Sequence, residues 1–258
     1  MKNKPKSRLD ATRRSARSTR FANQGNEVID LNTFREPERP SKFTKRVDIY
    51  PRNDAQEQYL DQLMDENNRI VIASGSAGTG KSYMATLAAI KFLREGSTSK
   101  IIITRPMVEV ENEQVGFLPG DLNEKLAPWV RPLMDIFEEH YTKYAIAKML
   151  ADGVIEVSPL SFMRGRSFRN AIIIADEMQN ATPNQMLMLL TRISTNSRIL
   201  LTGDTRQTDR YGDQNGLVNL LTRLQNSERD GIVYTLFDKR HVERDPIVSE
   251  VLDLYEEC

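Results

Sequence analysis

The sequence of 258 residues contains very little cysteine, since Cys258 is the only one. A single thiol excludes an intramolecular disulfide framework and gives no basis for a cysteine-bound metal cluster. Long hydrophobic runs are missing too, because the longest apolar stretches are strand-sized and the N-terminus is polar. The sequence therefore offers no transmembrane span and no signal-peptide core, and we expect a cytoplasmic protein that does not contact a membrane.

The chain also lacks a net charge, with 36 basic and 36 acidic side chains, but these are unevenly distributed. Residues 1–20 contain eight basic side chains and one acidic one, Asp10, which gives this tail a charge of +7 and the remainder −7. A basic arm of this kind can bind nucleic acid. It can equally be a solvated, disordered tail, and the composition favours neither interpretation.

The length fits one large α/β domain with an extension. The first forty or so residues are rich in Arg, Ser, Lys and Asn, and they show no sustained periodicity. From Asp48 onward, apolar residues recur in a regular pattern. We therefore predict a basic, disordered extension over residues 1–47 and a folded domain over residues 48–258.

Short apolar runs predict the strands of one sheet. They cover residues 70–73, 100–104, 154–157, 171–175, 198–202 and 231–237. Helical patterns alternate with these runs, and one helix is marked by a capping box of Thr182 and Gln185 around Pro183. Strands rich in Ile, Val and Leu need cover on both faces, so we predict an α/β fold with a mostly parallel sheet sandwiched by helices.

A glycine-rich stretch between the first predicted strand and the next predicted helix fits the pattern G-x-x-x-x-G-K-S/T. Glycines allow tight bends, so backbone N–H groups and the helix N-terminus can point at the phosphates of a nucleotide. Lys81 adds positive charge, and the Ser82 hydroxyl is a ligand for Mg²⁺. The arrangement is typical of a P-loop NTPase. The residues predicted to bind the nucleotide are Gly75, Ser76, Ala77, Gly78, Thr79, Gly80, Lys81 and Ser82.

Two carboxylates follow the predicted strand at 171–175 directly. In a parallel sheet the carboxyl ends of the strands lie at one edge, so Asp176 is expected beside the phosphate loop. There it can hold Mg²⁺ through water or through Ser82, and Glu177 can orient or deprotonate the attacking water. Asp or Glu alone could instead cap a helix, but the pair after such a strand favours the catalytic interpretation.

A second polar segment follows the predicted strand at 198–202. Gln207 has a neutral amide that can hydrogen-bond the γ-phosphate or the lytic water, and it can thereby sense whether that phosphate is present. Gly203 and Asp204 also fit an ordinary turn, and the sensor interpretation depends on the other motifs.

Three blocks together resemble the PhoH-like family, phosphate-starvation-associated ATPases related to superfamily-one helicases. They are the phosphate loop, residues 176–180 and residues 203–207. Similarity extends from about Ile49 to Tyr255 and includes residues 104–106, 116–122, 124–125, 163–166, 190–193 and Arg244. Met178 stands where the family usually has alanine, and Asp245 stands where it usually has histidine, so a role for that histidine does not carry over.

The resemblance implies ATP binding and hydrolysis with Mg²⁺, coupling to RNA or single-stranded DNA in the manner of a helicase or translocase, and assembly into a homo-oligomeric ring. In ring ATPases an arginine of the neighbouring subunit often completes the site. Arg244 and Arg192 are the candidates here. Arg192 also fits a surface ion pair, and Arg244 also fits a position just before the last helix, which Asp245 would cap.

Gln56 and a basic segment fit the same function but also have simpler interpretations. In many helicases a glutamine upstream of the phosphate loop reads the adenine edge, as Gln56 could, although an isolated glutamine on a helix is usually just exposed. Arg164 and Arg166, flanked by Phe162 and Phe168, can contact phosphates and stack on bases. Such residues are equally common as solvated charges over buried rings.

A second class of function remains open. In it the chain is an ATP-driven switch or a chaperone-like ring whose partner is a protein. Stimulation of ATP turnover by single-stranded RNA or DNA would favour the nucleic-acid-coupled function. A phosphotransferase fits less well, because Glu177 next to Asp176 favours activation of water over another acceptor.

Overall fold

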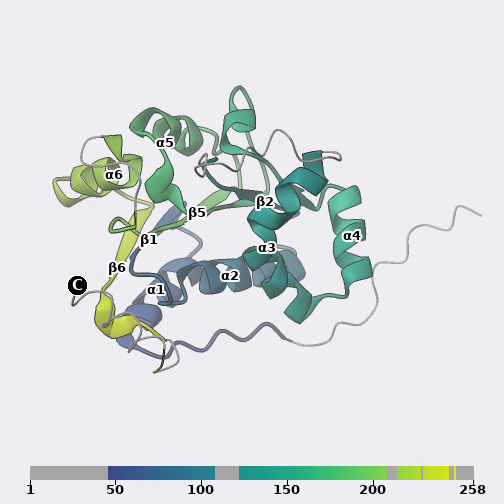
Figure 1. Cartoon of the computed structure of the whole chain (residues 1–258), viewed down its shortest axis with the longest axis horizontal. Helices are drawn as coiled ribbons and strands as arrows, with labels where there is room; N and C mark the ends of the chain where they lie inside the picture. Colours follow the sequence, from purple (N-terminus) through teal and green to yellow (C-terminus); the bar gives the residue numbers. More distant parts are fainter. Residues whose placement is uncertain (1–45, 108–121, 208–213, 228, 244–246, 248–258) are drawn as a thin grey trace, which may run out of the picture. The chain divides into compact units, whose positions relative to one another are not determined.

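A six-stranded sheet with parallel pairing throughout forms the centre of the described domain (Figure 1). This computed structural model describes residues 46–107, 122–207, 214–227, 229–243 and 247. The strands are β1 Ile70–Gly75, β2 Lys100–Thr104, β3 Ile155–Val157, β4 Ala171–Ala175, β5 Arg198–Gly203 and β6 Ile232–Phe237. Their spatial order is β3-β2-β4-β5-β1-β6. The mostly parallel sheet predicted from the sequence is confirmed.

Helices connect the strands and cover both faces of the sheet (Figure 1). They are α1 Asp54–Met64, α2 Lys81–Glu95, α3 Leu122–His140, α4 Lys143–Ala151, α5 Pro183–Leu190 and α6 Gly216–Gln225. Among the described residues, three short 3₁₀ helices are η3 Leu160–Met163, η4 Met178–Asn180 and η6 Lys239–His241. In Figure 1, α5 and α6 lie above the sheet, and α1 and α2 lie below it.

The strands separate two hydrophobic cores, because successive side chains of a strand point to opposite faces. In β2, Ile101 and Ile103 belong to the core shared with α1, α2 and α3. Ile102 between them belongs to the other core, which includes residues of η3, η4, α5 and α6. All three side chains are fully buried. Two-sided burial explains why these strands are continuous apolar runs instead of alternating ones.

Local signals fix the ends of two helices that the sequence predicted. The capping box of α5 is present: Gln185 N donates to Thr182 Oγ1 at 3.2 Å, and Thr182 N donates to Gln185 Oε1 at 2.9 Å. Pro183 occupies the first turn of that helix. Gly96 ends α2 in the left-handed conformation, with φ of 79°.

The strand order brings the motif-bearing strands together at one edge. β1 pairs with β5 on one side and with β6 on the other, and β4 pairs with β5. β1 and β5 extend into the motif residues, because Ser74 pairs with Gly203 and Gly75 pairs with Phe237. The predictions of 70–73 and 198–202 therefore ended these two strands too early. Pairing with neighbouring strands keeps the last residues extended, and the sequence does not show which strands are neighbours.

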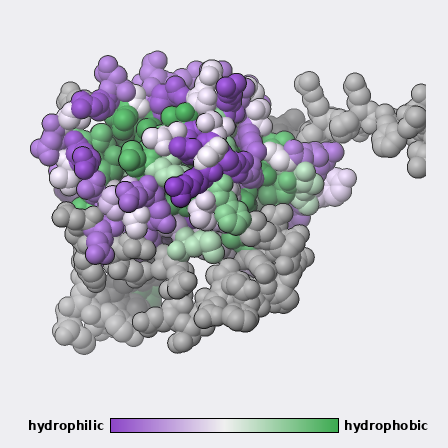
Figure 2. Space-filling model, turned by 90° about the horizontal axis from the view of Figure 1, so that it is seen from above, coloured by the Kyte–Doolittle hydropathy of each residue, from purple (hydrophilic) through white to green (hydrophobic). Residues whose placement is uncertain are grey.

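The face of the molecule on the side of α5 and α6 carries many polar side chains (Figure 2). Figure 2 shows hydrophilic side chains over much of the upper face, with hydrophobic ones visible between them. Among the helices of the described ranges, none combines the length and the apolar character that a membrane crossing requires.

Candidate functional site

The phosphate loop connects β1 to α2 and bends at its glycines. Gly75, Gly78 and Gly80 all have positive φ, of 145°, 83° and 80°. At Gly75 a side chain is also excluded by close packing, because a Cβ atom there would lie 1.9 Å from the Phe237 carbonyl oxygen on β6. The loop therefore depends on glycine for its bends and for its contact with β6.

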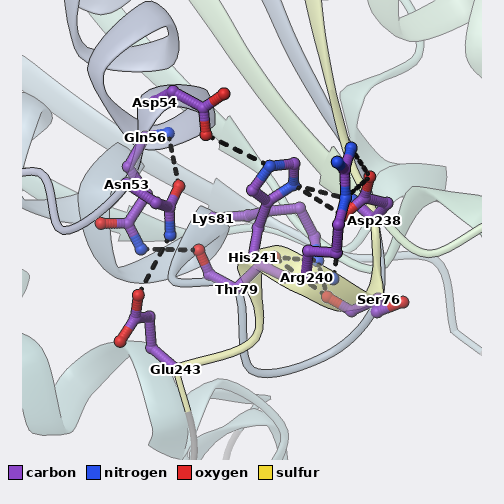
Figure 3. A network of polar contacts seen from close by, with 10 residues as sticks. All are labelled: Asn53, Asp54, Gln56, Ser76, Thr79, Lys81, Asp238, Arg240, His241 and Glu243. Atoms are coloured by element: carbon purple, nitrogen blue, oxygen red, sulfur yellow. Dashed lines mark hydrogen bonds and ion pairs between the residues drawn. The ribbon is translucent and has the colours of Figure 1, made fainter.

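The Lys81 ammonium group lies inside the curve of this loop (Figure 3). Its Nζ donates to the carbonyl oxygens of Gly75 and Ser76, both at 2.6 Å, and to Thr79 Oγ1 at 3.1 Å. The residue is only 7% exposed. A positive charge is thus held at the centre of the loop, where an anionic ligand would benefit most from it.

Asp176 is the buried carboxylate of the site, with 2% exposure. Its Oδ1 accepts a hydrogen bond from Ser82 Oγ at 2.7 Å and another from Thr202 Oγ1. Its Oδ2 accepts from Arg105 Nε at 3.0 Å and forms an ion pair with Arg105 Nη2. Residues from β5, α2 and the end of β2 therefore fix this carboxylate, which leaves neither oxygen unbonded.

Glu177 follows directly and lies in the left-handed region, with φ of 56°. A non-glycine residue there is strained, and such strain concentrates at functional sites. Its Oε2 accepts a hydrogen bond from Gln179 Nε2 at 2.7 Å. The other end of the Gln179 amide accepts from the Asp204 backbone N–H at 3.1 Å. Gln179 therefore joins the carboxylate after β4 to the loop after β5.

These groups line one cavity of about 210 Å³ at the carboxyl edge of the sheet. Its lining residues are Ala77, Gly78, Gly80, Lys81, Ser82, Tyr83, Asp176, Glu177, Gly203, Asp204 and Gln207. The backbone N–H of Gln207 closes the turn predicted there by donating to the Asp204 carbonyl at 3.1 Å. The structure thus brings the phosphate loop, both carboxylates and Gln207 to one place.

A larger cavity, of about 310 Å³, lies away from these motifs near Arg69 and Arg198. Burial lowers the pKa of Arg198, whose guanidinium donates to the Asn68 and Asp65 carbonyls at 2.8 and 3.0 Å. Arg69 donates likewise to the Ser197 carbonyl at 2.7 Å. These contacts tie the end of α1 and the loop after it to the sheet, so we assign them a structural role.

The oxygen donors at the site suit Mg²⁺. The Ser82 hydroxyl and the Asp176 carboxylate are hard ligands that lie next to each other. Within the described residues there is no group of three or more His, Cys, Asp or Glu side chains that could hold a metal by themselves. This pattern fits an ion that keeps several waters and shares its coordination with substrate phosphates, as Mg²⁺ does.

Gln56 contacts the phosphate loop and is 5% exposed. Its Nε2 donates to the Thr79 carbonyl at 3.1 Å, and its Oε1 accepts from the Arg52 backbone N–H at 2.8 Å. The residue is therefore not the exposed surface glutamine that was one alternative. Both ends of its amide are hydrogen-bonded to backbone groups. The adenine-reading role predicted for Gln56 would need this same amide.

Neither Arg192 nor Arg166 lines the cavity that contains the phosphate loop. Arg192 donates to the Met188 and Arg166 carbonyls at 3.0 and 3.1 Å. Arg166 pairs with Glu156 and lies 4.7 Å from the ring centroid of buried Phe168. For Arg166 this is the arrangement of a charge over a buried ring.

Two other residues of the segment that contains Arg166 are exposed in the described part of the chain: Arg164, and Phe162 with 56% exposure. The basic tail, Arg244 and Asp245 lie outside the described residues.

Three residues of the site were not singled out from the sequence as functional. Arg105 and Thr202 bind Asp176, and Gln179 binds Glu177. Each lies at or just after the carboxyl end of a strand, and that position was the available signal. Which strands are neighbours could not be read from the sequence, so their partners could not be assigned.

The match to known proteins covers most of the chain. The PhoH-like protein family matches residues 48–256. The PhoH-like protein of Bacillus subtilis is 38% identical over 217 residues, which are 84% of this chain and 66% of that protein. Protein PhoH of Escherichia coli is 36% identical over 212 residues, which are 80% of this chain and 58% of that protein. The chain thus spans roughly two thirds or less of these relatives.

A solved structure, the Sulfolobus solfataricus SWI2/SNF2 ATPase core in complex with dsDNA, shows only a distant likeness. Its TM-score is 0.37, at 16% identity over 61% of this chain and 33% of that chain. The fold is that of a P-loop NTPase, because a parallel sheet places a G-x-x-x-x-G-K-S loop and a buried aspartate at one edge. With the family match over residues 48–256, the chain belongs to the PhoH-like family.

Proposed function

We propose that this protein binds ATP and hydrolyses it with Mg²⁺ in the cavity at the carboxyl edge of the sheet. One observation carries the proposal: Ser82 Oγ and Asp176 Oδ1, the two expected metal-binding groups, lie 2.7 Å apart. The cavity beside them is also lined by Lys81 and Glu177. Phosphate charge, metal and attacking water would therefore meet within a few ångströms.

The phosphate loop and Lys81 would bind the ground state. Backbone N–H groups at the start of α2 point along the helix axis, and the helix dipole favours an anion there. Lys81 Nζ would exchange loop carbonyls for phosphate oxygens. Bound Mg²⁺ would neutralise phosphate charge, and Ser82 and Asp176 are the residues that would hold it.

Glu177 would act in the chemical step. Gln179 holds Oε2, so we assign Oε1 to accept the proton from water as its oxygen attacks the γ-phosphorus. The bond between the γ-phosphorus and the bridging oxygen breaks, and ADP leaves with that electron pair. Gln207, at the rim of the same cavity, would hydrogen-bond the γ-phosphate or the water.

Coupling to RNA or single-stranded DNA is the partner class that we propose. It is supported by the +7 charge of residues 1–20 and by the exposed Arg164 and Phe162. An exposed ring and a cation can together bind a base and its phosphate. We further propose that the protein acts in the cytoplasm as a homo-oligomeric ring in which Arg244 or Arg192 reaches the neighbouring site.

ATP turnover with and without single-stranded RNA and DNA tests this function. We expect Mg²⁺-dependent hydrolysis that increases when nucleic acid is added. Lys81→Ala should abolish it, whereas Lys91→Ala, in the same helix but away from the cavity, should not. No turnover under any of these conditions would overturn the proposed hydrolysis. Turnover that nucleic acid leaves unchanged would favour a protein partner.

A further inference from the structure

Two consecutive carbonyl groups of the phosphate loop accept hydrogen bonds from separate parts of the chain. The Gly78 carbonyl accepts a hydrogen bond from the backbone N–H of Glu243 at 2.9 Å. The Thr79 carbonyl accepts one from Gln56 Nε2 at 3.1 Å. Gln56 belongs to α1 and Glu243 follows η6, so the loop is supported from both ends of the domain's sequence.

These two bonds control the direction of the next two N–H groups. In a planar trans peptide, the C=O of one residue and the N–H of the following residue point in opposite directions. Because hydrogen bonds hold the Gly78 and Thr79 carbonyls on one side of the loop, the N–H groups of Thr79 and Gly80 point to the opposite side. Gly78, Gly80 and Lys81 line the cavity, so we infer that these N–H groups face it.

The two supports are also joined to each other (Figure 3). Asn53 caps α1, with its Oδ1 accepting from the Gln56 backbone N–H at 3.0 Å. The same side chain donates from Nδ2 to Glu243 Oε1 at 3.1 Å. One amide therefore holds the helix that carries Gln56 and the segment that carries Glu243.

His241 fixes that segment against α1 as well (Figure 3). Its Nε2 lies 3.3 Å from Asp54 Oδ1, and its Nδ1 accepts from the Asp238 backbone N–H at 3.1 Å. Its ring stands perpendicular to Phe237, with centroids 6.2 Å apart. These contacts of His241 act together with the Asn53–Glu243 bond to place the Glu243 N–H.

We propose that Gln56 is a positioning residue for the phosphates of the nucleotide and not a reader of its base. Together with the Glu243 N–H it forms a brace, defined as the two donors to the Gly78 and Thr79 carbonyls. The brace pre-orients N–H groups for phosphate oxygens, so its contribution is independent of the base. This proposal deepens the nucleotide-binding function proposed above and depends on it.

Equilibrium binding of ATP, GTP and inorganic tripolyphosphate separates the two roles of Gln56. Gln56→Ala should weaken all three by a similar factor of about ten, which is the loss expected for one buried hydrogen bond. Gln58→Ala is the matched control, because it is an exposed glutamine in the same helix. It should leave the three affinities unchanged.

A reader of adenine would give another result. Loss of ATP affinity alone, with tripolyphosphate binding intact, would overturn the brace and restore base recognition. If the wild-type protein bound none of the three ligands, that result would contradict both the proposed nucleotide-binding function and the proposed brace. Binding by wild type with equal binding by Gln56→Ala would overturn the brace alone.

A second variant tests the brace where Gln56→Ala fails to fold. Asn53→Asp keeps an oxygen to cap α1 but replaces the donor to Glu243 with a second carboxylate. Repulsion should then displace the Glu243 segment and weaken tripolyphosphate binding several-fold while the helix remains capped. Unchanged tripolyphosphate affinity in a folded Asn53→Asp protein would overturn the contribution of Glu243.

Discussion

Lys81 and Glu177 differ in the step that each would affect. Lys81 meets phosphate charge that is present before the reaction, whereas Glu177 acts on water during the chemical step. We therefore predict that Lys81→Ala loses ATP binding. Glu177→Gln should retain ATP binding and lower turnover on the order of a hundredfold or more. Equilibrium ATP binding and single-turnover hydrolysis measure the two effects separately.

An exposed glutamate in α1 provides the control for this pair of variants. Glu57→Gln makes the same chemical change away from the cavity and should leave both measurements unchanged. Hydrolysis near the wild-type rate in Glu177→Gln would remove this residue from the role of base.

Gln179 joins Glu177, which follows β4, to the Asp204 backbone, which follows β5. Gln179→Leu should lower kcat about tenfold with little change in KM, because Glu177 would lose its orienting bond. An unchanged kcat in Gln179→Leu would contradict this coupling.

At the scale of elements, β3 is attached to its surroundings by an ion-pair cluster around Glu156. Arg166 chiefly, and Lys100 on β2 as well, hold the pKa of the Glu156 carboxyl below its usual value of 4.5. A lowered pKa stabilises the fold above pH 4.5, and this stabilisation is lost as the pH falls through the lowered value.

We therefore predict that Glu156→Gln costs about 1 kcal/mol or less near neutral pH. The difference from wild type should vanish in acid, below the lowered pKa. Urea unfolding of both proteins at several pH values measures this, with Glu57→Gln as the exposed control. A difference that persisted unchanged in acid would show that the cluster does not act through ionised Glu156.

The elements themselves were largely readable from the sequence. Residues 100–104 and 171–175 were predicted with the bounds that β2 and β4 have, because an apolar run with polar ends defines a doubly covered strand. Thr182 and Gln185 marked the start of α5, since a capping box is a local signal. Strand order was not readable, because pairing joins segments far apart in the chain.

The same limit applied to the site. The loop at 75–82 and the carboxylates at 176–177 could be found, because each lies within one contiguous motif. Arg105 could not be assigned to Asp176, since their contact requires β2 to lie next to β4. The backbone contact of Glu243 with Gly78 has no side-chain signature at all.

At the scale of the whole molecule, residues 1–20 are proposed to add affinity for nucleic acid. Deleting them should weaken binding to single-stranded RNA or DNA and flatten its salt dependence, because fewer counterions are released. Basal ATP turnover should remain, since this tail lies outside the cavity-lining residues. Binding titrations at several salt concentrations test both parts. An unchanged affinity and slope would assign the tail the role of a solvated extension.

A catalytic arginine donated between subunits can be tested by mixing inactive proteins. Glu177→Gln subunits keep their arginines, and Arg244→Ala subunits keep their own site. If Arg244 acts across the interface, mixed assemblies should regain turnover, because such an arginine contributes about 10³–10⁵ in rate. Demonstrated mixing without recovery would count against Arg244, and Arg192→Ala would be mixed next. An active monomer would exclude both.

The position of β1 between β5 and β6 also has a consequence for how the chain acquires its shape during synthesis. β1 is made early, yet both of its hydrogen-bonding neighbours are made late, and Ser82 precedes Asp176 by 94 residues. Until those later strands leave the ribosome, the apolar stretch of β1 has no partner and is vulnerable to aggregation. The nascent chain therefore acquires its phosphate-binding loop only after β5 and β6 have been made, through a slow closure of long-range contacts.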